Sequence, residues 1–271
     1  MLKAYGKSAI ISLVVIFTVL GFTQAKPKIE SYVVRNQIED LNQKTLREVK
    51  EARVEEETEA IVEELLQTTD PIYASDLEKE QISILPKKYL EVPFVCQAPL
   101  QTEENWKLHE ESCEEAALLQ AYLYETGKFI SKEQANEVIL DMIEWQEKTE
   151  NFGTHKDLYS KGMTKFITGY YNLEESSVKV IKNADIEDIK GQITKGHPVI
   201  VPITGEILKN PYYPYPGYHM LTVIGYTEDR IITNDNGTRN GADFSYNQKT
   251  FEAAMKDASG DIIILDLSGK D

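Results

Sequence analysis

Two apolar runs joined by a short polar turn constrain the fold of this chain more than any other feature. Residues 220–226 and 230–234 are rich in β-branched side chains, and Thr227–Asp229 separates them. This pattern predicts an antiparallel hairpin. We expect three further strands in the same half of the chain and a short strand that opens the domain. These strands are predicted at residues 178–182, 198–204 and 262–267, and at residues 90–95.

Helix-start signals dominate the first half of the predicted domain. Ser112 followed by Glu115 is a capping-box pattern, which predicts a helix that begins at Cys113 and ends before Gly127. Similar polar residues predict three more helices, at residues 131–148, 154–171 and 185–195. Helices first and strands later are typical of an α+β fold, in which the helices pack on an antiparallel sheet.

The predicted hairpin brings a histidine and a carboxylate together. His219 begins the first apolar strand, and Asp235 follows the second. In an antiparallel hairpin the start of the first strand and the end of the second lie at the same edge of the sheet, so we expect the two side chains to be close. A catalytic base and its orienting carboxylate need this arrangement. Taken alone, Asp235 could belong to an ordinary turn and His219 could be a core histidine.

A cysteine stands where the first helix is predicted to begin. The exposed N–H groups and the positive end of the helix dipole favour the thiolate of Cys113, which is the nucleophilic form. Glu114 and Glu115 oppose the thiolate by like-charge repulsion, so a lowered pKa needs help from a histidine. The alternative is a structural cysteine, or a disulfide with Cys96, the other cysteine of the sequence.

One glutamine and three more histidines complete the candidate set. Gln97 precedes the cysteine, and its amide and the N–H of Cys113 could donate to the oxygen that becomes negative when a thiolate attacks a carbonyl. His109 is close to the cysteine in sequence and is the second candidate for the base. We interpret His197 as structural and His155 as a surface residue.

The order of these residues resembles a known family, the stand-alone bacterial cysteine peptidases related to the bacteriocin-leader (family C-39) type, within the papain superfamily. The likeness covers about residues 88 to 268. Asn236 departs from the pattern, because such relatives usually carry proline there. The residues that carry the likeness are Gln97, the Ser-Cys-Glu-Glu-Ala run at 112–116, Tyr218–His219, Gly225–Tyr226 and residues 234–239.

The resemblance implies a papain-like fold and four working residues. Cys113 would be the nucleophile, His219 the base and acid, Asp235 the residue that orients the histidine, and Gln97 the oxyanion donor. The implied reaction is hydrolysis of an amide, as in a peptide or protein substrate, through a thioester. Two alternatives stay open: an acyltransferase or amide-crosslinking enzyme with the same triad, and a non-catalytic cell-envelope module that binds a peptide.

A loop rich in tyrosine and proline directly precedes His219. Tyrosine offers a large contact area at a small entropic cost, so residues 211–218 are a candidate substrate rim. The alternative is a rigid surface loop without a binding role. The candidate substrate-binding residues are Trp106, Tyr213, Tyr215 and Tyr218.

Charge and composition exclude several classes of function. The 271 residues carry a formal net charge of −16, which opposes nucleic-acid binding because phosphate contacts need an excess of lysine and arginine. The sequence has no His or Cys pair at metal-ligand spacing and no phosphate-binding glycine loop. We therefore expect neither a metal nor another cofactor.

The N-terminal part of the chain has a separate organisation. Residues 1–25 combine two lysines, an uncharged apolar run and a small-residue cleavage pattern, which predicts a signal peptide, or an N-terminal membrane anchor if it is not cleaved. Residues 26–87 are predicted to be an acidic helical stalk and linker, and residues 88–271 a papain-like cysteine peptidase-like domain. The domain is then expected outside the cytoplasm, secreted or held at the cell envelope.

Overall fold

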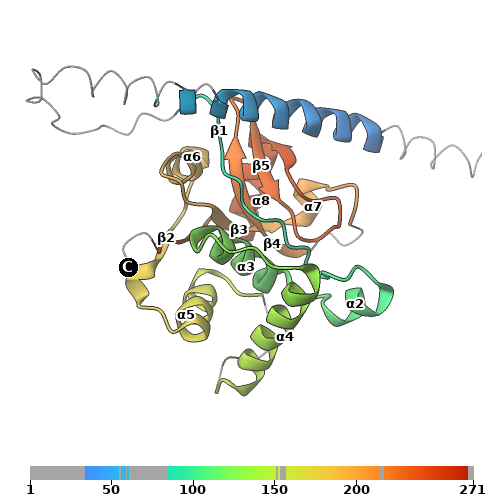
Figure 1. Ribbon diagram of the computed structural model, residues 1–271, viewed down its shortest axis with the longest axis vertical. Coiled ribbons are helices and arrows are strands. Elements are labelled where there is room, and N and C mark those ends of the chain that lie inside the picture. The colour runs from blue at the N-terminus through green and yellow to red at the C-terminus, as the bar shows by residue number, and fades with distance from the viewer. Residues whose placement is uncertain are drawn as a thin grey trace, which may run out of the picture. The chain divides into compact units, whose positions relative to one another are not determined.

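The computed structural model describes residues 34–54, 56–58, 60, 85–150, 152, 157–213 and 217–267. The chain divides into two compact units, residues 1–44 and 45–271. Residues 34–44 of the first unit are helical, and so are residues 45–54 of the second, so an N-terminal helix is present as predicted. The second unit contains the sheet and the helices that pack on it (Figure 1).

A seven-stranded antiparallel sheet forms the centre of the second unit. Its strands follow the order β2-β7-β3-β4-β5-β6, and β1 pairs with β4 off this path. The strands are β1 (Lys88–Tyr89), β2 (Val178–Ile181), β3 (Val199–Thr204), β4 (Tyr218–Tyr226), β5 (Arg230–Asn234), β6 (Phe244–Asn247) and β7 (Ile262–Leu265).

The predicted hairpin is confirmed as β4 and β5. Thr222 lies opposite Asn234, and the two strands run antiparallel. His219 is the second residue of β4, and Asp235 directly follows the last residue of β5. The two candidate residues are therefore carried to the same edge of the sheet by the register of the hairpin.

Helices cover both faces of the sheet. Helix α3 (Cys113–Glu125) contacts β3, β4 and β7, and it shares one apolar core with α4 (Lys132–Lys148) and α5 (Ser160–Tyr171). Figure 1 shows these three helices on one side of the sheet. Helix α8 (Gln248–Ala258) contacts β3, β5 and β6, and its buried side chains lie outside that core, so it covers the opposite face. The remaining helices are α2 (Glu103–Leu108), α6 (Ile186–Thr194), α7 (Gly205–Leu208) and the 3-10 turn η1 (Glu175–Ser177).

Three of the predicted helix starts are correct, and α3 begins at Cys113 and ends before Gly127 as predicted. A capping box of Ser131 with Gln134 begins α4, and Asp185 caps α6 in the same way. The capping box predicted at Ser112 and Glu115 is wrong. Ser112 makes no side-chain cap hydrogen bond, and the carboxylate of Glu115 accepts from the side chain of Gln146 instead.

Other element boundaries also differ from the prediction. The helix expected from residue 154 begins at Ser160, and Thr154 lies outside the described residues. The expected strand at 90–95 is wrong, because strand pairing stops at Tyr89. Strand β6 and helix α8 were not predicted, although Asn247 gives a cap signal by accepting from the N–H groups of Lys249 and Thr250.

The described residues include only part of the N-terminal region for which predictions were made. Residues 1–25, with the predicted signal or anchor, and most of the linker before residue 85 lie outside the described residues. None of the described helices is both long enough and apolar enough to cross a membrane. The domain boundary at residue 88 stays a prediction.

Candidate active site

A cleft of about 560 Å³ lies where α2, the start of α3 and the start of β4 meet. Cys113 and His219 both line it, and so does Gln97. The three residues come from different segments: an irregular stretch after β1, the first position of α3 and the second position of β4. A cavity of this size is typical of a small-molecule or peptide-binding site.

His219 and Asp235 form a direct contact at the edge of the sheet. The Nε2 atom of His219 lies 3.0 Å from Oδ1 of Asp235. Because an ionised carboxylate can only accept, Nε2 carries the proton and the neutral ring keeps its lone pair on Nδ1. The histidine is thereby held in the tautomer that a base acting through Nδ1 needs.

Asp235 is fully buried and is held by several donors. Its Oδ2 accepts from Asn210 Nδ2 at 2.9 Å and from the hydroxyl groups of Tyr246 and Tyr213 at 2.5 and 3.2 Å. Burial alone would raise the pKa of Asp235, but the hydrogen bonds from His219, Tyr246 and Asn210 hold that pKa below its usual value. The residue therefore stays ionised over the neutral range.

The thiol of Cys113 is directed toward its neighbour in sequence. Its Sγ donates to Oε2 of Glu114 at 2.9 Å. Burial raises the pKa of the Cys113 thiol well above its ordinary value, and the charge of Glu114 raises it further, whereas a backbone hydrogen bond from Met220 acts in the opposite direction. Desolvation and Glu114 therefore outweigh the helix start, which by itself would favour the thiolate. No hydrogen bond joins this sulfur to His219 within the part of the chain that the structure describes.

Glu114 is itself buried and perturbed. Its Oε1 accepts the backbone N–H of Leu158 at 2.9 Å, which ties the start of α3 to the segment before α5. Burial, together with the charge of Glu115, raises the pKa of Glu114 to about 8. Burial likewise raises the pKa of Glu115 to about 7. Near neutral pH, Glu114 is thus largely protonated.

Gln97 lies beside the nucleophile candidate, but its amide is already engaged. Its Nε2 donates to the backbone carbonyls of His109 and Glu110 at 3.0 and 2.9 Å. Both carbonyls belong to the turn that precedes Cys113. Donation to an oxyanion would therefore require one of these two hydrogen bonds to open.

The comparisons with known proteins place this geometry in a family. The Peptidase_C39 like family matches residues 89–260, more than half of the chain. The chain belongs to this family. It is a cysteine peptidase-like enzyme, and the predicted fold, with helices packed on an antiparallel sheet as in papain-like peptidases, is confirmed.

Two solved structures are similar at low sequence identity. The first is a protein from Bacillus anthracis named as a C39-like peptidase, with 15% identity, a TM-score of 0.48, and coverage of 66% of this chain and 96% of that one. The second is xylellain, a cysteine protease from Xylella fastidiosa, with 12% identity, a TM-score of 0.46, and coverage of 73% and 94%. No curated protein matches the chain.

Asn236 joins the three segments of the site in this C39-like peptidase. Its Nδ2 donates to the carbonyls of Cys113 and Met220 at 2.9 and 3.1 Å, and its own carbonyl accepts the N–H of Gln97 at 2.9 Å. The side chain is fully buried. Proline, expected at this position from the family pattern, could not make the two side-chain bonds, so the departure affects more than the turn.

The aromatic candidates divide into those at the cleft and one that the structure does not describe. Trp106, Tyr213 and Tyr218 line the cleft and are half-buried. The ring of Tyr213 lies 5.3 Å from that of His219, and the hydroxyl of Tyr218 donates to the carbonyl of Leu158 at 3.0 Å. Tyr215 lies outside the described residues.

His109 is fully buried and is not among the described residues that line the cleft. Its Nε2 lies 2.9 Å from Oδ1 of Asn136, and its Nδ1 lies 3.3 Å from Oγ of Ser112. Burial lowers the pKa of His109. With both ring nitrogens engaged, it is poorly placed to act as the base. His155 lies outside the described residues.

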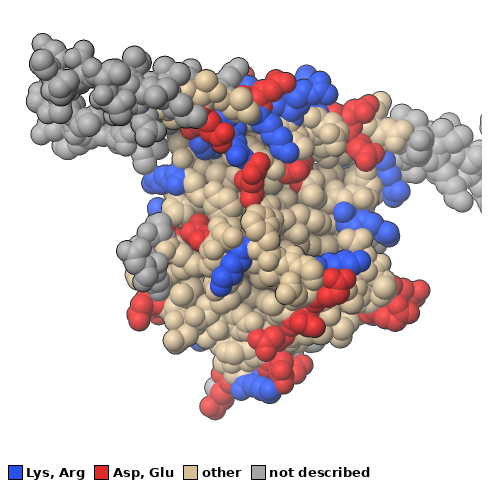
Figure 2. All heavy atoms as spheres, in the orientation of Figure 1, with Lys and Arg blue, Asp and Glu red and all other residues tan. Residues whose placement is uncertain are grey.

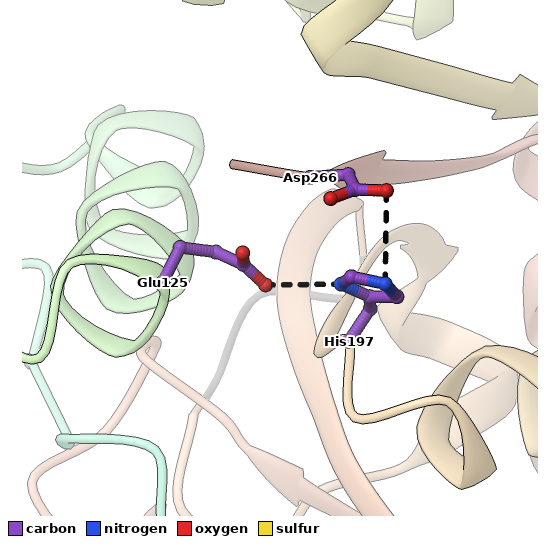
Figure 3. Close-up of side chains that lie close together, drawn as sticks. All are labelled: Glu125, His197 and Asp266. Carbon is purple, nitrogen blue, oxygen red and sulfur yellow. Dashed lines mark hydrogen bonds and ion pairs between the residues drawn. The ribbon is translucent and has the colours of Figure 1, made fainter. Parts of the chain in front are cut away.

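His197 bridges two carboxylates on the far end of α3 from Cys113. Its Nδ1 lies 3.2 Å from Oε1 of Glu125 and its Nε2 3.7 Å from Oδ2 of Asp266 (Figure 3). The hydrogen bond to Glu125 raises the pKa of His197, and Asp266 adds to this. The three side chains are close enough to consider a metal ion. However, the carboxylates face different nitrogens of one ring, which fits a protonated imidazole better than a shared cation.

Both cysteines are free thiols in the structure, and both are buried. Burial raises the pKa of Cys96 to about 11, so this thiol is a poor nucleophile at neutral pH. Cys113 is the cysteine that lines the cleft together with His219. The cleft, rather than the thiol pKa, therefore distinguishes the two.

Proposed function

We propose that this C39-like peptidase hydrolyses peptide bonds through a Cys113–His219–Asp235 triad and that it acts outside the cytoplasm. The observation that carries the proposal is the contact of 3.0 Å between His219 Nε2 and Asp235 Oδ1 in a cleft that Cys113 also lines. The extracytoplasmic location is supported by the signal-like residues 1–25.

The proposed reaction has two stages. His219 Nδ1 takes the thiol proton, and the Cys113 thiolate attacks the carbonyl carbon of the substrate to give a tetrahedral oxyanion. The C–N bond then breaks as His219 passes the proton to the leaving amine, which leaves a thioester on Cys113. Water, deprotonated by His219, attacks the thioester and releases the carboxylic acid and the thiol.

The resting contact with Glu114 fits this sequence as a starting state. Cys113 must turn its Sγ away from Oε2 of Glu114 before His219 can take the proton. The N–H of Cys113 and the amide of Gln97 are proposed to stabilise the oxyanion, and donors of this kind each contribute about 2.7–4 kcal/mol in other enzymes.

The test is cleavage of a defined peptide mixture, read by mass spectrometry of the new termini. Wild type is expected to produce new termini, and Cys113→Ala and His219→Ala are expected to lose them. Cys96→Ala is the matched control and should retain cleavage. Cleavage that survives Cys113→Ala, or that is lost in Cys96→Ala, would contradict the assignment. An added amine separates hydrolysis from acyl transfer, because only a transferase yields the new amide.

A further inference from the structure

Acidic side chains surround the proposed nucleophile. Glu103 on α2, Glu110 and Glu111 in the turn before α3, and Asp157 before α5 all line the cleft and are exposed. Among the described lining residues, Lys107 is the one lysine or arginine. Four exposed carboxylates against one ammonium give the cleft an excess of three negative charges.

The single lysine is already paired within its own helix. Its Nζ lies 3.0 Å from Oε1 of Glu103, four residues earlier in α2. The lysine therefore offsets Glu103 and leaves Glu110, Glu111 and Asp157 without a cation among the described lining residues. Glu110 and Glu111 adjoin the start of α3, whereas Asp157 comes from the segment before α5, so the charge reaches the cleft from two sides.

The wall of the cleft also offers aromatic surface. Trp106, Tyr213 and Tyr218 are half-buried and line the same cavity as the carboxylates. Lysine and arginine side chains combine a long apolar stem with a cationic end, and they pack well on aromatic rings. A wall that combines carboxylates with aromatic rings thus matches both parts of a basic side chain.

We propose that the cleft selects peptides with lysine or arginine side chains beside the scissile bond, an inference that rests on the proposed function. The stems of these side chains lie on the aromatic rings, and their cationic ends reach Glu110, Glu111 and Asp157. A cleft lined mainly by negative charges and bounded by low-dielectric walls also focuses its electric field. This raises the rate of association with a positively charged partner.

The surroundings of the cleft add to the same field. Figure 2 shows acidic side chains over α2, which carries part of the cleft lining, and over α4. A bound divalent metal is a weaker explanation of the charge. No three of the cleft carboxylates, in the part of the chain that the structure describes, come close enough together to share an ion.

The test uses the full chain and three active-site probes. The probes are peptidyl acyloxymethyl ketones of identical sequence, except that lysine, glutamine or glutamate precedes the reactive group. Mass spectrometry of the peptide that contains Cys113 gives the labelling rate for each. We expect the lysine probe to react about ten-fold or more faster than the glutamate probe at low salt, with glutamine between them. The ratio of the lysine-probe rate to the glutamate-probe rate should fall at high salt, because salt screens exposed charges.

Variants test whether the cleft carboxylates cause the preference for the lysine probe. The double change Glu110→Gln and Glu111→Gln should reduce the gap between the lysine and glutamate probes. Glu104→Gln is the matched control, because Glu104 is exposed on α2 but is not among the described lining residues, and it should keep the full gap. Iodoacetamide, which is small and neutral, reports the reactivity of Cys113 itself, and each probe rate is divided by the iodoacetamide rate of the same variant.

The outcomes separate this proposal from the one on which it rests. Equal rates for the three probes, or a gap that the double change leaves intact, would overturn the charge preference while the peptidase assignment stands. If iodoacetamide labels Cys113 and none of the peptidyl probes does, the peptidase assignment fails and the substrate preference fails with it.

Discussion

Replacing Glu114 by glutamine tests how the site controls its thiol. Cys113 Sγ donates to Glu114 Oε2 at 2.9 Å, so an ionised Glu114 stabilises the thiol and opposes the thiolate. Glutamine keeps the shape, can still accept the N–H of Leu158, and presents an amide N–H to the sulfur. A hydrogen bond to a charged group contributes about 1.5–3 kcal/mol. At roughly 1.4 kcal/mol per pKa unit, the pKa of Cys113 should fall by about one to two units.

The difference should depend on pH in a defined direction. The pKa of Glu114 is raised to about 8, so below that pH its side chain is largely neutral and resembles the glutamine of the variant. Above that pH, wild-type Glu114 is ionised and suppresses the thiolate, whereas the variant has no charge to do so. The two proteins should therefore react alike in mild acid and diverge above about pH 8.

The assay is the rate of alkylation of Cys113 by iodoacetamide as a function of pH, in a Cys96→Ala background that leaves one thiol. The rate of Glu114→Gln should reach its plateau at lower pH than that of the parent. Glu115→Gln is the comparison variant, because Glu115 is equally buried on the same helix but is hydrogen-bonded to Gln146, and its charge raises the pKa of Cys113 less than that of Glu114 does. An unchanged profile in Glu114→Gln, or an equal shift in both variants, would refute the reasoning.

Three further changes should alter stability in predictable ways. Asn236→Ala leaves two buried carbonyls without their donor and should lower the free energy of unfolding by about 1–3 kcal/mol for each, as measured by urea denaturation. Gly241→Ala should destabilise by about 1–3 kcal/mol in the same assay, because its Cβ would lie 1.7 Å from the backbone oxygen of Asp235. The raised pKa of His197 contributes stability that is fully present below its unfolded value of 6.5 and is lost as pH rises through the folded pKa. His197→Ala should therefore cost up to about 1 kcal/mol near pH 5 and less near pH 9, because the group is partly exposed.

Each of these changes has a control that the chain provides. Asn240→Ala removes an exposed amide from the same loop and should have little effect on unfolding. Gly191→Ala adds a methyl group in α6 where nothing lies within 4 Å, and it should stabilise rather than destabilise. A pH-independent loss in His197→Ala would show that packing, and not the ion pair with Glu125, explains its effect.

The fold was predictable where the determinants are local. The two apolar runs and the turn at Thr227–Asp229 predict the hairpin of β4 and β5, and the hairpin register alone carries His219 and Asp235 to one edge. The capping box at Ser112 failed for a non-local reason. Gln146, more than 30 residues away, binds the carboxylate that was expected to reach back to the helix start. Propensity at a helix end is weak compared with a buried tertiary partner.

The site was predictable in its residue types but not in its contacts. Asn236 could not be recognised from the sequence as a link between Cys113 and Met220, because both carbonyls lie far from it along the chain. The orientation of the Cys113 thiol toward Glu114 could likewise not be predicted from the sequence. From the sequence, both glutamates after the cysteine were expected to repel the thiolate. Their burial in the structure raises the pKa of Glu114 to about 8 and that of Glu115 to about 7, so Glu114 is largely neutral near pH 7.

The two buried carboxylates of the site are driven in opposite directions by their surroundings. Asp235 is surrounded by donors, including His219, Asn210 and Tyr246, and its pKa is lowered. Glu114 is comparably buried, but it accepts from the N–H of Leu158 and the thiol of Cys113, and burial raises its pKa. At neutral pH, negative charge therefore lies behind His219 and is largely absent beside Cys113, where it would oppose the thiolate. This separation is what an imidazolium–thiolate pair requires.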